Sequence, residues 1–151
     1  MDKSLLDTDM LSEILKGINQ TIITKAADYR AAFDFYTVSV ITVMEIIKGF
    51  HKLELENRIQ EFQTQLRNAE VLPFDRPSSE LAGRIYADLE RTGQPIGRAD
   101  PMIAAIALHH GLVLVTGNTA HYQRIQQLNY DLRLDNWRDE IMLNTDEENL
   151  P

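Results

Sequence analysis

Short apolar runs alternate with helix-like repeats along this chain. Four runs are typical of β-strands: residues 4–6, 36–39, 70–72 and 112–115. Between them, apolar residues recur every three or four positions, which predicts helices with one buried face in segments 55–66, 81–89 and 102–107. Strands separated by helices pair in parallel through right-handed crossovers. The pattern therefore predicts an α/β fold in which helices sandwich a short parallel sheet.

Glycine and proline fall where this pattern needs helix ends and starts. Gly93 and Gly111 each follow a periodic stretch, where a left-handed cap is expected. Pro77 and Pro101 stand where first helical turns are expected. These positions support the predicted helices.

The composition is that of one globular domain. With 44% hydrophobic and 25% charged residues, the chain is neither depleted of apolar side chains nor rich enough in them for a membrane span. Residues 144–151 are acidic and nearly free of apolar side chains, so we expect them to fray. We predict a single domain over residues 1–143, followed by this flexible tail.

Cysteine is absent from the chain. Disulfides, thiolate zinc sites and cysteine nucleophiles are thereby excluded, which fits a reducing compartment. The first residues offer only two apolar side chains between charges, too few for a secretory signal. We therefore expect a cytoplasmic protein that does not use a membrane.

The chain is acidic, with a formal net charge of −8. Nonspecific nucleic-acid affinity comes mainly from Lys and Arg, so this charge argues against a general polyanion binder and makes any nucleic-acid contact local. Carboxylates gathered around a divalent cation also leave an excess of negative charge when the ion is not counted. The charge therefore directs attention to acidic residues that share a site.

Polar side chains stand at the ends of the predicted strands. Asp7 ends the first strand, Glu45 lies one to two turns into the helix after the second, Asp100 opens the helix before the last clear strand, and Asn118 follows that strand. In an open parallel sheet, ligands bind outside the carboxyl ends of the strands. We expect all four side chains to reach one rim.

Such a set of carboxylates suits hydrolysis of a phosphodiester. The reaction requires neutralised phosphate charge and a hydroxide near neutral pH, and Mg²⁺ or Mn²⁺ held by two to four carboxylates supplies both. The chain has neither the cysteines nor the His-Glu-x-x-His motif of zinc enzymes. Magnesium or manganese is therefore the expected ion.

Each carboxylate also has an alternative, structural interpretation. Asp100 before Pro101 is a good N-cap, and Thr42-x-x-Glu45 has the form of a capping box that would turn Glu45 back onto the backbone. Asp7 is different, because an acid directly after a buried strand is costly to desolvate without a partner. The pattern favours a functional role at Asp7 and leaves both interpretations open at the other two.

Four segments in order resemble PIN-domain ribonucleases, specifically the VapC toxins of bacterial toxin–antitoxin pairs. Residues 5–9, Leu-Leu-Asp-Thr-Asp, resemble the opening strand and first acid, and residues 39–49 resemble the S-x-x-T-x-x-E-x-x-x-G segment with the second. Residues 97–105 resemble the D-x-x-I-A-A helix with the third acid, and residues 111–122 the stretch that follows it. The order and spacing of the segments make the resemblance specific.

The resemblance implies a PIN-like fold, a doubly wound sheet of four or five parallel strands. It also implies an Mg²⁺- or Mn²⁺-dependent endoribonuclease that acts on tRNA or another structured RNA, forms a homodimer and is inhibited by a VapB-type antitoxin. Family products carry a 5′-phosphate and a 3′-hydroxyl, as expected when water attacks in line instead of the ribose 2′-hydroxyl.

The site residues follow from the same resemblance. It makes Asp7 and Asp100 metal ligands and Glu45 a ligand or the residue that orients the attacking water. Thr116 would hold Asp7 through its hydroxyl, and Asn118 would contribute its amide or a bound water.

The chain departs from the family at two positions. Asn118 stands where many PIN nucleases have a fourth acid, and Tyr122 stands where the motif has Phe. Asp9, two residues after Asp7, either compensates for the missing acid or is a polar start to the first helix.

Basic residues near the motifs are candidate RNA contacts. Lys48 and Lys52 follow Glu45 by three and seven residues and share its helical face. Arg98 and Arg124 would extend that patch. The alternative is that all four are ordinary solvated residues.

The remaining histidines and apolar residues have simpler explanations. We assign no catalytic role to His109, His110 and His121, which a helix end or the surface explains. The apolar residues of the first helices, with Trp137, are expected in the core or a dimer interface; they are Ile14, Leu15, Ile18 and Ile22.

Two other functions compete. Asp7 and Asp9 form the D-x-D that opens haloacid-dehalogenase phosphatases, but Leu11 stands where that family has Thr or Val, and no acidic pair follows Thr116. An inactive PIN fold that serves as a binding module is the other alternative, because of the missing fourth acid.

Overall fold

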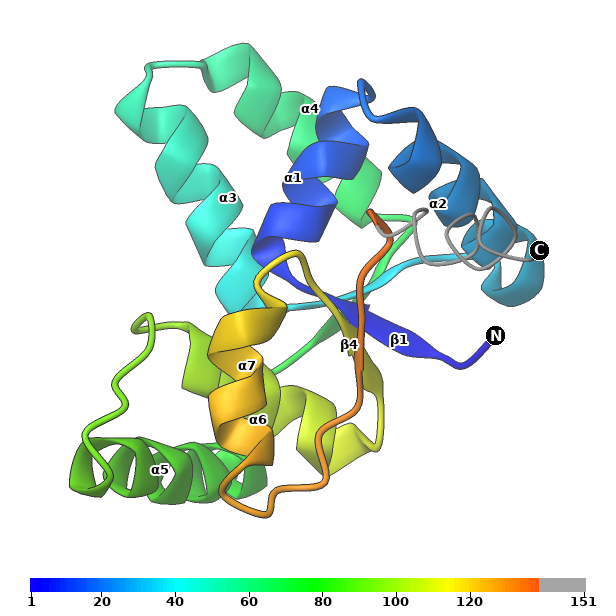
Figure 1. Ribbon diagram of the computed structural model, residues 1–151. Helices are drawn as coiled ribbons and strands as arrows, with labels where there is room; N and C mark the ends of the chain where they lie inside the picture. The colour runs from blue at the N-terminus through cyan, green and yellow to red at the C-terminus, as the bar shows by residue number, and fades with distance from the viewer. Residues whose placement is uncertain (139–151) are drawn as a thin grey trace, which may run out of the picture.

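The computed structural model describes residues 1–138, which form a five-stranded sheet with helices on both faces (Figure 1). The strands are β1 (Ser4–Leu6), β2 (Thr37–Ser39), β3 (Glu70–Leu72), β4 (Val113–Val115) and β5 (Leu134–Asp135). They lie in the order β3-β2-β1-β4-β5, and every pairing is parallel. This arrangement confirms the predicted α/β sandwich, and the four predicted strands lie within one residue of their predicted bounds.

Seven helices connect the strands within the described residues. They are α1 (Thr8–Lys16), α2 (Gln20–Phe33), α3 (Val40–Lys52), α4 (Glu56–Leu66), α5 (Arg76–Arg91), α6 (Asp100–His110) and α7 (Thr119–Gln126). Helices α1 to α4 pack on one face of the sheet and α5 to α7 on the other (Figure 1). The chain is thus doubly wound, and its carboxyl strand ends open between the two layers.

The core has two halves, one on each face of the sheet. Leu5 and Leu114 are fully buried in the half formed by α5, α6 and α7. Their neighbours Leu6 and Val115 are fully buried in the half formed by α1 to α4. Successive side chains of a strand point to opposite faces, so strands covered on both faces bury every side chain. This explains why β4 is apolar throughout and why even the polar residues of β1 and β2 are buried.

Helix α6 is the most deeply buried helix that carries a predicted site residue. Residues 103–107 are all fully buried, which leaves only its two ends near solvent. Pro101 lies in its first turn, and Gly111 caps its end with φ of 64°, a conformation that glycine adopts without strain. The helix therefore holds its first and last residues at fixed places on the molecule.

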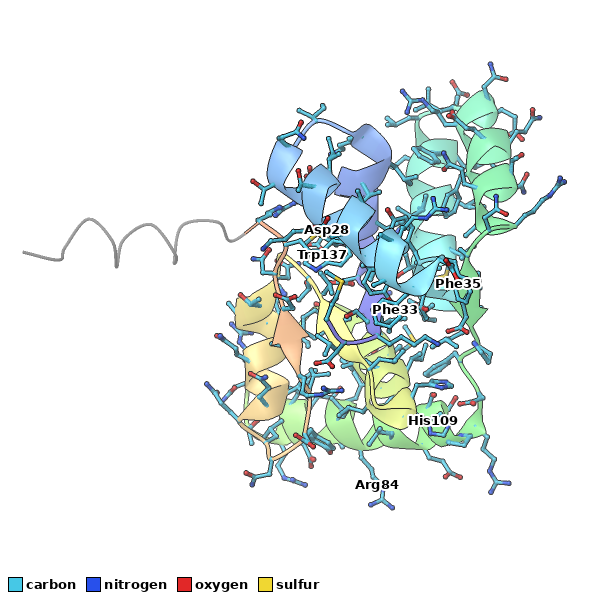
Figure 2. The ribbon with its side chains drawn as sticks, turned by 90° about the vertical axis from the view of Figure 1, so that its right-hand side faces the viewer. Asp28, Phe33, Phe35, Arg84, His109 and Trp137 are labelled. Carbon is cyan, nitrogen blue, oxygen red and sulfur yellow. The ribbon has the colours of Figure 1, made fainter. Side chains whose placement is uncertain are left out.

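The end of the described chain returns to the core. Trp137 is only 3% exposed, and its ring lies 5.7 Å from that of Tyr29 on α2 (Figure 2).

Of the apolar residues expected in the core or an interface, Ile22 is fully buried, whereas Ile18 is 80% exposed, so only Ile18 is available for an interface. Within residues 1–138 no helix has the length and apolar character to span a bilayer. The predicted tail, 144–151, lies outside the described residues.

Candidate active site

Asp7 lies where β1 ends, and its carboxylate is 4% exposed. One oxygen, Oδ1, accepts a hydrogen bond from the backbone N–H of Thr8 at 2.8 Å and so caps α1. The other, Oδ2, accepts from the Thr116 hydroxyl at 2.8 Å. Thr116 follows β4, which pairs directly with β1, so the sheet itself brings the two residues together. The structure thus has the contact expected between Thr116 and Asp7.

Negative charge at Asp7 is costly. Burial raises the pKa of Asp7 from 3.8 to about 7, and the charges of Asp9 and Asp100 add to the rise, although the two hydrogen bonds oppose it. The charge of Asp100 also acts on Asp9, so the three carboxylates lie close enough to repel one another. A cation placed among them would remove that cost.

Glu45 reaches the same rim through Thr8. The Thr8 hydroxyl donates to Glu45 Oε1 at 2.6 Å and lies 3.0 Å from the Thr42 hydroxyl. Helix α3 begins at Val40, and its N-cap is Ser39, whose hydroxyl accepts from the Thr42 N–H at 3.1 Å. The capping-box interpretation of Glu45 is therefore wrong, because the N-cap of α3 is Ser39, three residues before Thr42. Glu45 is free to point at the rim.

Asp100 is the first residue of α6, not its cap. Ala99 occupies the N-cap position and makes no side-chain capping bond, so the N-cap interpretation of Asp100 is also wrong. Instead, Asp100 Oδ1 accepts from the Tyr122 hydroxyl at 3.3 Å, and Oδ2 lies 3.4 Å from His121 Nδ1. The carboxylate of Asp100 is therefore held by two residues of α7.

Tyr122 is a site residue that sequence reasoning missed. It is fully buried, and burial raises its pKa well above 10, with the charges of Asp7 and Asp100 adding to the rise. Its hydroxyl therefore stays protonated and can donate beside two carboxylates. The available signal was tyrosine at a position where the family motif has phenylalanine, which adds only this hydroxyl.

Asp9 joins the rim from the first turn of α1. Its Oδ2 accepts from the backbone N–H of Gly117 at 2.9 Å, whereas the buried Oδ1 has no partner. Burial raises the pKa of Asp9 as well. A Cβ on Gly117 would lie 2.6 Å from Arg138 Nη1 and 2.7 Å from Asp9 Oδ2, so a larger residue there would displace these side chains. Asp9 is both a polar start to the helix and a fourth carboxylate.

Asn118 stands just outside this set. Its backbone N–H donates to the Thr116 hydroxyl at 2.9 Å, and its exposed side chain makes no capping bond. The amide of Asn118 is thus free to contact a ligand at the mouth of the rim. Thr116, in turn, receives one hydrogen bond and donates another, which fixes the proton of its hydroxyl toward Asp7.

The four basic residues predicted to contact RNA differ in their exposure and in their partners. Lys48, Lys52 and Arg98 are exposed. Arg124 donates through Nη1 to the carbonyl of Pro95 at 2.9 Å, which ties it to the loop before α6. The first three are therefore open to solvent, whereas Arg124 has a structural partner.

The donor set suits a hard divalent cation. Carboxylate oxygens are its only charged members, the charges of neighbouring acids raise the pKa values of Asp7 and Asp9, and one buried oxygen of Asp9 lacks a partner. No three of these acids have ligand atoms within 4.8 Å of one another; among residues 1–138 only Asp75, His109 and His110 do. The carboxylates thus surround a common space, but no three of them converge on a single point.

Comparison with known proteins agrees with this geometry. The family model of the PIN domain matches residues 4–126. The tRNA(fMet)-specific endonuclease VapC of Shigella flexneri is 33% identical over 142 residues, which cover 91% of this chain and 99% of that protein. Toxin FitB of Neisseria gonorrhoeae is 30% identical over 125 residues, which cover 78% and 89%.

Solved structures show the same likeness. DNA-bound VapBC from Salmonella typhimurium matches with a TM-score of 0.76 at 32% identity and covers 91% of this chain and 99% of the matched one. FitAcB from Neisseria gonorrhoeae matches with a TM-score of 0.74 at 27% identity and covers 89% and 98%. The chain therefore belongs to the PIN domain family and, within it, to the VapC group.

Proposed function

We propose that this chain is an Mg²⁺- or Mn²⁺-dependent endoribonuclease toxin that hydrolyses RNA phosphodiesters. The observation that carries the proposal is the shared rim: the charges of Asp9 and Asp100 act on the buried Asp7, and Glu45 joins them through Thr8. Relatives that are named as VapC endonucleases support it. Family membership sets aside the haloacid-dehalogenase alternative.

Asp7, Asp100 and Glu45 would hold the cation. When bound, it would neutralise charge on the scissile phosphate and supply hydroxide near neutral pH. Thr116 and the Thr8 N–H fix the two oxygens of Asp7, and the Tyr122 hydroxyl fixes one of Asp100. Glu45 orients the attacking water, while the exposed amide of Asn118 contacts the phosphate or its water shell.

The RNA would lie across the exposed end of this rim. Lys48 and Lys52 on α3 and Arg98 before α6 contact phosphates, and Arg124 contributes less because Pro95 already engages it. A structured RNA such as tRNA is the proposed substrate, as the name of the Shigella relative states for that protein. Cleavage should leave a 5′-phosphate and a 3′-hydroxyl.

A VapB-type antitoxin is the proposed partner, since the similar structures are toxin–antitoxin complexes. An apolar groove of about 300 Å³ near α1 offers a place for an inhibitory segment, with Leu11, Ile14 and Phe62 among its lining residues. We further propose that the protein is a cytoplasmic homodimer. The exposed Ile18, between α1 and α2, is the candidate contact in the dimer interface.

Mapping RNA ends tests the enzyme proposal. The wild type, Asp100→Asn and Asp28→Asn are briefly induced in cells, and RNA 5′ ends are sequenced. Asp28 is an exposed acid on α2, so it controls for the substitution itself. Discrete new 5′-phosphate ends are expected with the wild type and Asp28→Asn and not with Asp100→Asn. If all three chains give the same ends as uninduced cells, the chain is the inactive binding module.

A further inference from the structure

A second group of possible metal ligands lies at the other end of α6. His109 and His110 are the last residues of that helix, and Asp75 is the N-cap of α5. One ligand atom from each of the three lies within 4.8 Å of the other two, a spacing that no other such group reaches in the part of the chain that the structure describes. Figure 2 labels His109 near α5.

Asp75 is already oriented for such a role. Its Oδ1 accepts from the Ser78 N–H at 3.0 Å, which fixes the carboxylate at the start of α5. Its Oδ2 faces His109 Nε2 at 3.6 Å. Hydrogen bonding to Ser78 lowers the pKa of Asp75, and nearby His109 and His110 lower it further. One oxygen is therefore held in place, and the other is left for a ligand.

The two histidines converge although they are adjacent in sequence. Successive side chains of an ideal helix point about 100° apart. Here the ring centroids are 4.8 Å apart and meet edge to face, at the turn where Gly111 ends the helix. Both side chains are exposed, so burial in the core does not explain their placement. His109 forms an ion pair with Asp75, whereas His110 interacts with Asp75 and Glu70 only through its charge.

We propose that Asp75, His109 and His110 form a second metal site that takes a transition-metal dication of the Zn²⁺ type. Two imidazoles and one carboxylate suit Zn²⁺, Ni²⁺ or Cu²⁺ and not Mg²⁺. In a tetrahedral site with ligand bonds of about 2.1 Å, donor atoms lie about 3.4 Å apart. His109 Nε2 and Asp75 Oδ2 are already 3.6 Å apart, and a side-chain rotation would bring the third donor in from within 4.8 Å. Three protein ligands leave a fourth position for water.

The site is separate from the carboxylate rim and does not depend on the proposed nuclease function. Helix α6 places Asp100 at one end and the histidines at the other, about 15 Å apart at 1.5 Å per residue. A cation here would join the start of α5 to the end of α6. Because it binds the folded chain, it would raise the melting temperature of the protein.

Zn²⁺ titration of the untagged full chain tests this site. Calorimetry is done with Mg²⁺ in large excess, because a hard cation occupies the oxygen ligands of the rim and does not compete for imidazole. One Zn²⁺ per chain is expected. His109→Ala and His110→Ala should each weaken binding about tenfold or more, and His51→Ala, on the exposed end of α3, should not.

A second variant separates ligation from folding. Asp75→Asn keeps the helix cap, since Asn caps as well as Asp, but it removes the charged ligand and should also weaken Zn²⁺ binding. Near neutral pH in EDTA, the His109→Ala and His110→Ala variants should melt like the wild type, and Asp75→Asn should melt only slightly lower because it lacks a charge that stabilises the fold. The proposal is overturned if Zn²⁺ does not bind, if both histidine variants bind it like the wild type, or if only Asp100→Asn abolishes binding, which would place Zn²⁺ at the rim.

Discussion

Asp7 and Asp75 both cap a helix, but their pKa values shift in opposite directions. Each accepts a backbone hydrogen bond at a helix N-terminus, Asp7 at α1 and Asp75 at α5. Burial beside other acids raises the pKa of Asp7 to about 7, whereas hydrogen bonding to Ser78 and nearby histidines lower that of Asp75. A capping position therefore does not determine the pKa of a carboxylate. Its burial, its hydrogen bonds and its charged neighbours do.

The surroundings also decide which ion each carboxylate would attract. Around Asp7 the donors are buried or half-buried carboxylate oxygens, with the charge of Arg138 acting on Asp9, and oxygen donors favour a hard cation. Around Asp75 the donors include two exposed imidazoles, which favour a softer one. The predictions below test this difference between the two regions.

The largest effect is expected on catalysis at the rim. Asp7→Asn keeps the helix cap and the side-chain size but removes the charge, so RNA cleavage should fall by about 10²–10³-fold, the worth of a few kcal/mol of cation stabilisation. Initial rates on a tRNA substrate with Mn²⁺ measure this. Asp28→Asn should cleave at the wild-type rate, and a matching loss in that variant would contradict a specific role for Asp7.

The pH dependence of stability should differ in sign between the two acids. Between about pH 4 and pH 7 the folded chain keeps a proton on Asp7 that the unfolded chain has released, so the free energy of unfolding falls as pH rises. The fall is worth a few kcal/mol, at about 1.4 kcal/mol per pKa unit. Asp75, with a lowered pKa, stabilises the fold above its unfolded pKa, and that contribution is lost as pH falls.

Urea unfolding in EDTA from about pH 2 to about pH 7 measures both contributions. Asp7→Asn should gain stability relative to the wild type as pH rises from about 4 toward 7. Asp75→Asn should lose stability relative to the wild type as pH rises through the range below about 4, where Asp75 ionises in the folded wild type. Parallel profiles for the two variants would mean that the two carboxylates have similar environments.

A smaller effect is expected from the hydroxyl of Tyr122. Tyr122→Phe keeps the buried ring and removes the donor to Asp100, so Mn²⁺ affinity or kcat should fall about tenfold to 100-fold, as for other outer partners of metal ligands. The KM for RNA should not change. Tyr130→Phe, which removes a hydroxyl that donates to Asp88, is the matched control. A Tyr122→Phe enzyme with wild-type metal affinity and kcat would show that the hydroxyl has no positioning role.

The smallest effect is expected from the exposed cations. Lys48→Ala and Lys52→Ala should each raise KM a few-fold and lower the salt dependence of RNA binding by about one counterion, with little change in kcat. Binding measured at several salt concentrations tests this. Lys16→Ala, on the exposed end of α1, is the control. If all three variants have the same salt dependence, the RNA does not cross α3.

The sequence predicted the sheet well because its physical signal is local. Residues 113–115 are buried on both faces and form an unbroken apolar run, and residues 5 and 6 are likewise apolar and buried. The pattern did not identify β5, because its two residues, Leu134 and Asp135, are only partly buried or exposed and too few to show a repeat. Asp7 was predicted because it directly follows such a strand, whereas Glu45 and Asp100 were assigned through the resemblance to PIN-domain ribonucleases.

Contacts between distant segments could not be predicted in the same way. The bond from Gly117 to Asp9 and the bond from Tyr122 to Asp100 depend on how α1 and α7 meet the sheet, which no local pattern records. His109 was correctly expected at a helix end. Its approach to Asp75 depends on the packing of α5 against α6, and so only the structure reveals it.

Titration with Mn²⁺, followed by the electron paramagnetic resonance of the free ion, tests the carboxylate centre most directly. The wild-type chain and a His109→Ala/His110→Ala double variant should both bind Mn²⁺ with the same affinity. Asp7→Asn and Asp100→Asn should each lose that binding. Retention of wild-type Mn²⁺ affinity in both acid variants would contradict a cation held at the rim by Asp7, Glu45 and Asp100.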